Sequence, residues 1–65
     1  MCLSTAYIVT GNKDDKVKEV MSDVALLEAE VNGFLLTTLL GEQKFVAGRI
    51  KSIDFIQDHS IVLES

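Results

Sequence analysis

Hydrophobic and polar residues alternate over most of this 65-residue chain, and this pattern predicts β-strands. The first apolar run is rich in β-branched and aromatic residues and ends at the turn-forming residues 11–16. Asn32-Gly33 is a strong hairpin dipeptide, because both residue types accept the positive φ of a type I′ turn. The predicted strands cover residues 3–10, 24–31, 34–40, 44–50, 52–57 and 61–64.

Residues 14–31 fit two patterns. Their hydrophobic residues recur at helical spacing, at Val17, Val20, Met21, Val24, Leu27 and Val31. The neighbouring hairpin signal, and the alternation of Leu27 and Ala29 with Glu28 and Glu30, favour a strand in the second half. We therefore expect a strand here, with one amphipathic helix over 14–31 as the alternative.

Five or six short strands joined by tight turns predict an all-β fold. We expect a single domain over residues 1–65, built as a small five- to six-stranded barrel of the SH3 or Sm type. A closed or half-closed barrel is favoured because it removes exposed strand edges.

The composition indicates that the chain needs further stabilisation. A domain of 65 residues buries only roughly 60% of the surface that its unfolded chain exposes, and such domains usually rely on a disulfide, a metal or a second copy. The single cysteine excludes an internal disulfide, whereas 48% hydrophobic residues is a generous share for a small monomer. We therefore expect a homodimer, with part of the hydrophobic surface forming the interface.

Charge and hydropathy limit the binding partners and the cellular location that we expect for this protein. Six basic and ten acidic residues give a net charge of −4, which disfavours nucleic acid because phosphate backbones are repelled. The apolar stretches are far shorter than the roughly 20 residues that span a bilayer. The N-terminus also lacks a signal-peptide pattern, so we expect a cytoplasmic protein with a reduced thiol.

The sequence predicts a protein that is not an enzyme. A nucleophile needs a base within hydrogen-bonding reach, and the one histidine, His59, lies in a predicted turn without a glycine-rich elbow nearby. The acidic pairs Asp14-Asp15 and Glu28/Glu30 are expected to be solvated charges. The four glycines are scattered and form no phosphate-binding loop.

An RNA-binding barrel is the alternative function. Lys44, Arg49 and Lys51 form the densest basic group, and small barrels bind single strands through a basic groove and stacking aromatics. The candidate aromatics, however, fit a core equally well, and three cations do not outweigh the acidic balance. They are Tyr7, Phe34, Phe45 and Phe55.

Cys2 is the one residue with distinctive chemistry. Its thiolate lies beside the terminal amine and a backbone amide nitrogen, and thiolate and nitrogen donors in a square plane suit Ni²⁺ or Cu²⁺. If Met1 is retained, its amine joins the donor set; if Met1 is removed, the Cys2 amine takes that role. One chain offers too few ligands, whereas two chains would complete a site. The plain alternative is an interaction module in which Cys2 is an inert hydrophobic residue.

Three segments of the chain are distinctive, namely MCLST at 1–5, GE…VAGRIKSIDF within 41–55, and HSIVLE at 59–64. With these segments, essentially the whole chain resembles the CooT family, whose members are linked to nickel insertion into carbon monoxide dehydrogenase and often labelled predicted RNA-binding proteins. It implies a small β-barrel homodimer that binds Ni²⁺ through Cys2 and assists carbon monoxide dehydrogenase or its maturation factors.

Overall fold

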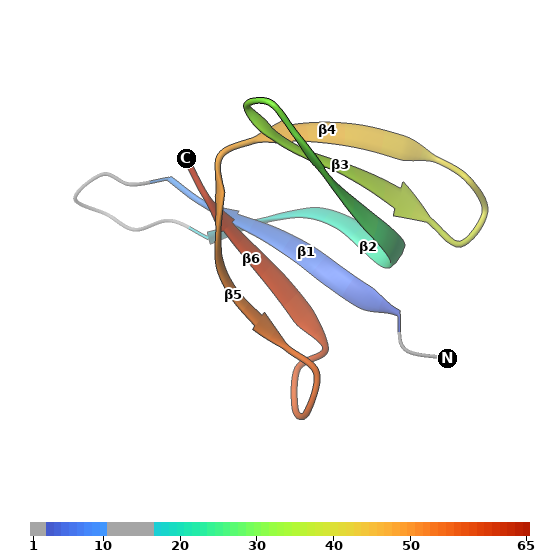
Figure 1. The fold of residues 1–65 in the computed structure, drawn as a ribbon. Helices are drawn as coiled ribbons and strands as arrows, with labels where there is room; N and C mark the ends of the chain where they lie inside the picture. The colour runs from blue at the N-terminus through green and yellow to red at the C-terminus, as the bar shows by residue number, and fades with distance from the viewer. Residues whose placement is uncertain (1–2, 11–16) are drawn as a thin grey trace.

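The described part of the chain, residues 3–10 and 17–65 of a computed structural model, is built from β-strands and contains no helix, which confirms the all-β prediction (Figure 1). No helix there could therefore cross a membrane. The predicted turn at 11–16 lies outside the described residues. The six strands are β1 (Ser4–Val9), β2 (Val17–Glu30), β3 (Gly33–Thr38), β4 (Gln43–Ala47), β5 (Arg49–Asp54) and β6 (Ser60–Glu64).

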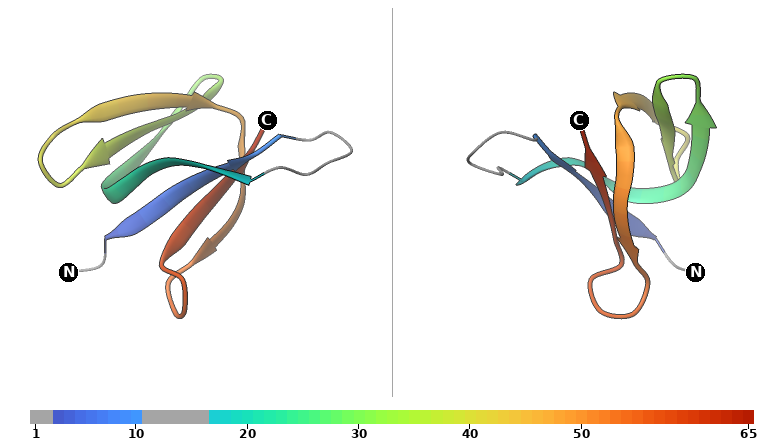
Figure 2. Two further views of the ribbon diagram at one scale, coloured as in Figure 1. Left: turned by 180° about the vertical axis from the view of Figure 1, so that it is seen from behind. Right: turned by 60° about the vertical axis from the view of Figure 1, so that its left-hand side comes forward.

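All six strands belong to one sheet, in the order β4-β3-β2-β1-β6-β5. The β1–β6 pair is parallel and the other pairs are antiparallel. The two edge strands, β4 and β5, are separated in sequence by Gly48 alone. A flat sheet would hold its edges about 24 Å apart, at about 4.8 Å per strand spacing, and one residue cannot cross that gap. The sheet therefore curls until its edges meet at Gly48 (Figure 2).

The sheet curls like a barrel but is not closed. In the described residues β4 pairs with β3 alone and β5 with β6 alone. A single residue is too short a connection for an antiparallel hairpin, so β4 and β5 diverge from Gly48 instead of pairing. The predicted barrel is thus half-closed, with an opening on the side where β5 faces the hairpin of β2 and β3 (Figure 2).

The ambiguous segment is a strand, and the helix alternative is wrong for residues 17–30. The first half of β2 pairs with β1 and the second half with β3, so its backbone is hydrogen-bonded on different sides along its length. Between the halves, Asp23 has a φ of 57° and the register shifts between Val24 and Leu26. This irregularity bends β2 between the half that pairs with β1 and the half that pairs with β3.

The hairpin after β2 exists, but its predicted turn is wrong. Glu30 pairs with Gly33, so the turn residues are Val31 and Asn32, one position earlier than expected. Neither Asn32 nor Gly33 is among the described residues with positive φ. Gly33 is required for a different reason: a Cβ there would overlap the carbonyl oxygen of Val46 and lie 2.9 Å from the Phe45 ring.

The predicted strand over 44–50 is split in two. Gly48 has a φ of 138°, which ends β4 and begins β5 in a new direction. A Cβ at Gly48 would also overlap the carbonyl oxygen of Glu64 on β6. Val46, Gly48 and Ile50 therefore do not share one face of a strand, because the chain turns at the middle residue.

The hydrophobic core lies in the hollow of the curled sheet and is small. Leu36 and Leu63 are its largest fully buried side chains, and they come from strands on either side of the hollow. The buried cluster consists of Ala6, Val24, Leu36, Val46, Ile61 and Leu63. Because few side chains are buried, the stability of the fold depends strongly on keeping the sheet curled.

We expect Gly48→Ala to destabilise the fold by about 1–3 kcal/mol, because alanine disfavours this φ and its Cβ would overlap the Glu64 carbonyl. Urea denaturation followed by circular dichroism measures the change. Gly41→Ala is the matched control, since Gly41 has a φ of 94° but open space around the added Cβ. Equal losses of unfolding free energy in the two variants would show that the contact between residue 48 and β6 does not affect stability.

Candidate functional site

The predicted metal ligands Met1 and Cys2 lie outside the described residues, so the structure defines the site from Leu3 onward. Ser4, two residues after Cys2, is buried and pairs with Val24 of β2. The next residue, Thr5, donates its N–H to the His59 carbonyl oxygen at 3.0 Å. The start of β1 is thereby fixed between β2 and the residue that precedes β6.

An apolar groove lies beside this start of β1. We call it the wedge groove; it occupies about 190 Å³ in the opening between β5 and the bend of β2. Residues 24–27 of β2 form one wall, Ile53 and Phe55 form the other, and Ser4 and Ile61 form the floor. No lining side chain is ionisable, although a quarter of the chain is charged. Sequence analysis missed this groove, and the one available signal was the hydrophobic pair at 53 and 55.

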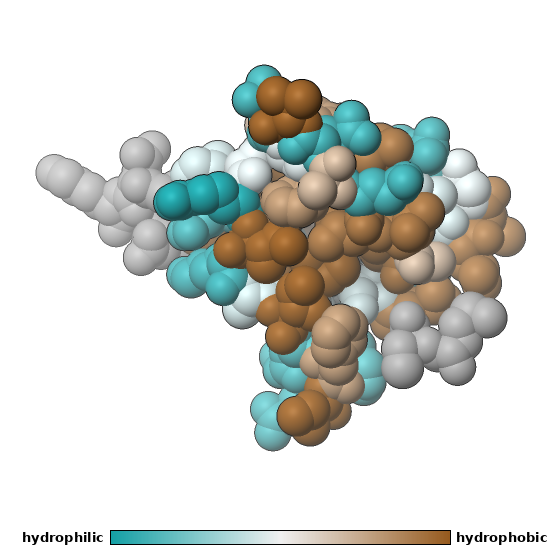
Figure 3. Space-filling model, viewed as in Figure 1, coloured by the Kyte–Doolittle hydropathy of each residue, from teal (hydrophilic) through white to brown (hydrophobic). Residues whose placement is uncertain are grey.

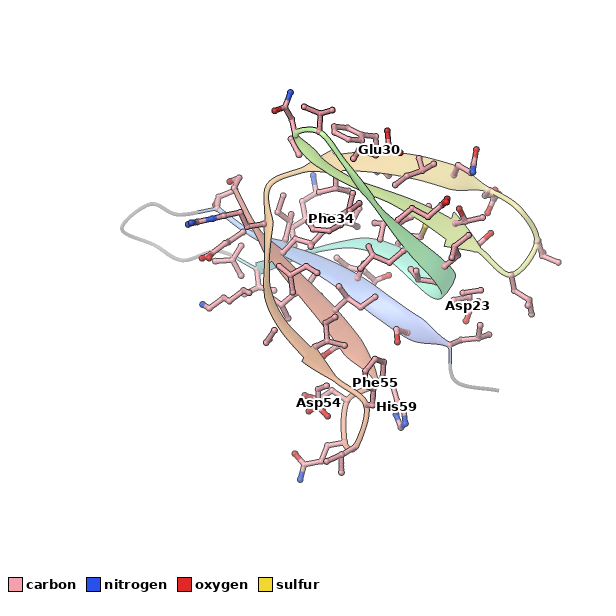
Figure 4. All side chains as sticks on the ribbon, in the orientation of Figure 1. Asp23, Glu30, Phe34, Asp54, Phe55 and His59 are labelled. Carbon is pink, nitrogen blue, oxygen red and sulfur yellow. The ribbon has the colours of Figure 1, made fainter. Side chains whose placement is uncertain are left out.

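A tight turn holds Phe55 at the rim of the groove (Figure 4). The Asp54 carboxylate accepts hydrogen bonds from the N–H groups of Ile56 at 2.8 Å and Gln57 at 3.0 Å. The amides of Gln57 and Ile56 hold the pKa of Asp54 below its ordinary value of 3.8. The turn leaves Phe55 64% exposed and Ile56 88% exposed. The charged Asp54 therefore stabilises a turn in which the side chains of Phe55 and Ile56 are exposed to solvent.

His59 lies at the same end of the molecule as the start of β1. Its φ is 49°, a conformation that histidine tolerates better than most side chains do, and its side chain is exposed. Within residues 3–10 and 17–65, no group of three or more His, Cys, Asp or Glu side chains is arranged to hold a metal ion.

The structure does not bring the three cations of the RNA-binding alternative together. Lys44 lies on β4, whereas Arg49 and Lys51 lie on β5, and the three cations line three different hollows. The Arg49 guanidinium lies 3.7 Å from the Glu64 carboxylate. The other two cations also line surface hollows with acidic residues, Lys44 with Glu19 and Glu42 and Lys51 with Asp58.

The aromatic residues are also dispersed. Phe34 packs against the core, and the Phe45 ring lies over Gly33 on the other face of β3. Phe55 is in the wedge groove, whereas Tyr7 lines a hollow beside Lys51. Lys44 lines another hollow with Lys18 and Phe45, so the basic and aromatic residues of the described chain are divided between separate hollows. Of the two acidic pairs, Glu28 and Glu30 are exposed as expected, and Asp14-Asp15 lies outside the described residues.

Comparisons with known proteins agree on one family. The family model described as "CO dehydrogenase accessory protein CooT" matches residues 1–64. A crystal structure of a protein from Carboxydothermus hydrogenoformans, assigned as CooT, superposes with a TM-score of 0.83 at 33% sequence identity. The match covers 97% of this chain and 95% of that one. No curated protein gives a match.

The lowered pKa of Asp54 predicts a loss of stability in acid. A carboxyl group with a depressed pKa stabilises the fold above its unfolded value, here 3.8, and this contribution is lost as the pH falls through the folded pKa. We expect Asp54→Asn to lose less stability than the wild type between about pH 5 and pH 2. Urea denaturation at each pH measures this, and identical losses in both proteins would contradict it.

Proposed function

The chain belongs to the CooT family of CO dehydrogenase accessory proteins, and from this membership we propose that it is a nickel-binding protein that aids CO dehydrogenase maturation. The family match over residues 1–64 carries the proposal, because it includes the N-terminal segment with Cys2. We propose that the protein acts by holding and delivering the ion and has no catalytic activity of its own. Its partners would be CO dehydrogenase or the maturation factors of that enzyme, in the cytoplasm.

The available donor atoms support a nickel site at the N-terminus. Cys2 is the single thiol of the chain, and no cluster of metal-binding side chains occurs among the described residues. A Cys2 thiolate and the main-chain nitrogens of Met1 and Cys2 can form small chelate rings around one ion. Ni²⁺ accepts such thiolate and nitrogen donors in a square plane, whereas Zn²⁺ prefers a tetrahedron.

We propose that two chains share one nickel ion. Each chain has one thiolate, and two thiolates with two nitrogens fill a square-planar site without any other side chain. A shared ion would also stabilise the association of two small domains, because the ion would bind only the paired form. This arrangement predicts one nickel ion for every two chains.

The RNA-binding alternative receives no support from the described residues. Its three cations line three different hollows, and an acidic residue also lines each one. These positions provide no continuous basic surface of the kind that releases counterions from a phosphate backbone. We therefore do not pursue it as a second proposal.

We expect Cys2→Ser to weaken nickel binding at least tenfold and to abolish the thiolate-to-nickel absorption band, because a hydroxyl group does not replace a thiolate. Calorimetric titration of the reduced protein measures affinity and stoichiometry, with absorbance recorded in parallel. Met21→Leu is the matched control, since it removes a thioether sulfur away from the N-terminus. Unchanged nickel binding by Cys2→Ser would show that the site lies elsewhere.

The accessory role predicts transfer of the ion. We expect the nickel-loaded protein to restore CO oxidation to nickel-free CO dehydrogenase faster than the same concentration of free Ni²⁺ in the presence of a weak chelator. Cys2→Ser mixed with the same nickel should give no acceleration over free Ni²⁺. Equal rates with and without the wild-type protein would contradict a role in delivery.

A further inference from the structure

We infer that the free edge of β4 is a docking strand for an extended, acidic segment of another protein, which pairs with it as an added strand. The inference goes beyond the proposed function and does not depend on where nickel binds. It rests on a hollow of about 430 Å³ beside β4, which we call the edge groove. The lining consists of Ile8 on β1, residues 18–20 on β2, residues 44–47 on β4, and Ser65.

The main chain of β4 is hydrogen-bonded on one side. Its pairing partner among the described residues is β3 alone. The N–H of Gly48, one residue beyond β4, donates to the Asn32 carbonyl oxygen at 3.2 Å. Because bonded and non-bonded positions alternate along an antiparallel ladder, the main-chain groups of the even-numbered residues in β4 also point to β3. Those of Phe45 and Ala47 therefore point to the free edge, where they have no main-chain partner in the described part of the chain.

Of the two edge strands, β4 has the more regular edge. Hydrophobic side chains gather along β5 (Figure 3). The register of β5 with β6, however, shifts between Ile50 and Ser52, and such a bulge displaces the groups that an added strand would pair with. β4 pairs with β3 at five consecutive positions without a shift. A partner strand can therefore follow β4 along its whole length.

The floor of the edge groove is apolar and comes from strands that are distant in the sheet order. Ile8 of β1 and Val20 of β2 pack against the buried core, yet both are only partly buried. A strand paired with β4 would lie about 4.8 Å beyond it and would place every second side chain on this floor. Main-chain hydrogen bonds and a floor for alternate side chains are the two features by which sheet edges bind extended peptides.

Two lysines determine which peptide fits. Lys44 lies on the same face of β4 as the buried Val46, two residues on. Lys18 pairs opposite Ile8, so these two side chains share a face of the sheet. Both lysines therefore lie on the side of the apolar floor. A segment on this floor is complementary if it carries a carboxylate among its apolar side chains.

The remaining charged residue of the groove does not cancel this preference. Glu19 also lines the groove, but it pairs opposite Tyr7 on the face of the sheet away from Ile8. Its carboxylate thus belongs to the other face from Lys18, its neighbour in the chain.

The same charges favour a different protein over a second copy. The β4 strand of a second copy would add its own Lys44 to the two lysines already present, and its β5 strand would add Arg49 and Lys51. A lysine on an edge strand discourages indiscriminate pairing. An acidic segment avoids this repulsion and also satisfies the main-chain groups, which a phosphate ligand would leave unpaired.

The test uses peptides of defined sequence as probes. A random library of peptides about ten residues long, the length of a long strand, is displayed on phage and selected against the metal-free protein. We expect the selected peptides to alternate apolar residues with other residues and to contain Asp or Glu. Fluorescence anisotropy of the best labelled peptide then gives its affinity for each variant.

The first variant blocks the edge. We expect Ala47→Pro to weaken peptide binding at least tenfold, because proline removes an outward N–H and leaves the hydrogen bonds between β3 and β4 in place. Ala47→Ser is the matched control, since it changes the same side chain and keeps the N–H. Circular dichroism verifies that both variants fold.

The second variant reverses the charges and keeps the inference testable if Ala47→Pro fails to fold. We expect the double variant Lys18→Glu, Lys44→Glu to bind the acidic peptide at least fivefold more weakly. It should bind more tightly a peptide in which lysine replaces each acidic residue. Lys51→Glu is the control, because Lys51 lines a different hollow.

Hydrogen exchange locates the bound peptide. The amides of Phe45 and Ala47 should exchange more slowly when the peptide is bound, whereas those of Lys44 and Val46 are already bonded to β3 and should change little. Slower exchange of Phe45 and Ala47 at high protein concentration without peptide would assign the edge to a second copy and overturn the inference.

Three further results would also overturn it. The first is a library that yields no peptide with a dissociation constant below about 1 mM. The second is equal binding of the peptide by Ala47→Pro and Ala47→Ser. The third is a hollow that binds oligouridine RNA, loses it on charge reversal and keeps it in Ala47→Pro, because this pattern belongs to a phosphate ligand.

The docking strand and the nickel site are tested separately. We expect Ala47→Pro to bind nickel as the wild type does, and Cys2→Ser to bind the peptide as the wild type does. Loss of nickel binding alone would overturn the proposed function and leave the docking strand assigned. Absence of peptide binding alone would overturn the docking strand and leave the proposed function intact.

Discussion

The connection at Gly48 constrains the whole fold. Two strands at opposite edges of a six-stranded sheet follow one another with a single residue between them, so the sheet has to curl for the chain to be continuous. The φ of 138° and the close approach of the Glu64 carbonyl make glycine the residue suited to this position. The hollow that holds the core, with Leu36 and Leu63 at its centre, exists because of this curl.

The same connection explains why the curl is incomplete. One residue brings two strand ends together but cannot align them as a hairpin, so β4 and β5 separate and one side of the hollow stays open. The wedge groove is the result of that geometry, and the Asp54 turn adds Phe55 to its rim.

The proposed chemistry and the described scaffold have separate roles. In the proposed site, thiolate and main-chain nitrogen donors would come from the first two residues, and their affinity for Ni²⁺ would depend on the chemistry of those atoms. The scaffold contributes position, because Ser4 and Thr5 are fixed by β2 and by the His59 carbonyl. The groove beside the start of β1 is apolar.

Most strands and the candidate ligand Cys2 could be predicted from the sequence, since both are local properties. Alternation reports strand periodicity wherever one face is buried, and a thiol at position 2 keeps its neighbouring nitrogens in any fold. Tertiary structure decided what depends on distant partners. Residues 17–30 form a strand despite their helical spacing, because they pair with β1 and β3. Glycine is required at position 33 by the close backbone of β4 and not by a turn. Likewise, Gly48 ends a run that looks continuous, and Leu26 and Phe55 meet across a groove although 29 positions separate them. Closure of a sheet and contacts across it are set by long-range pairing, which no short window of sequence contains.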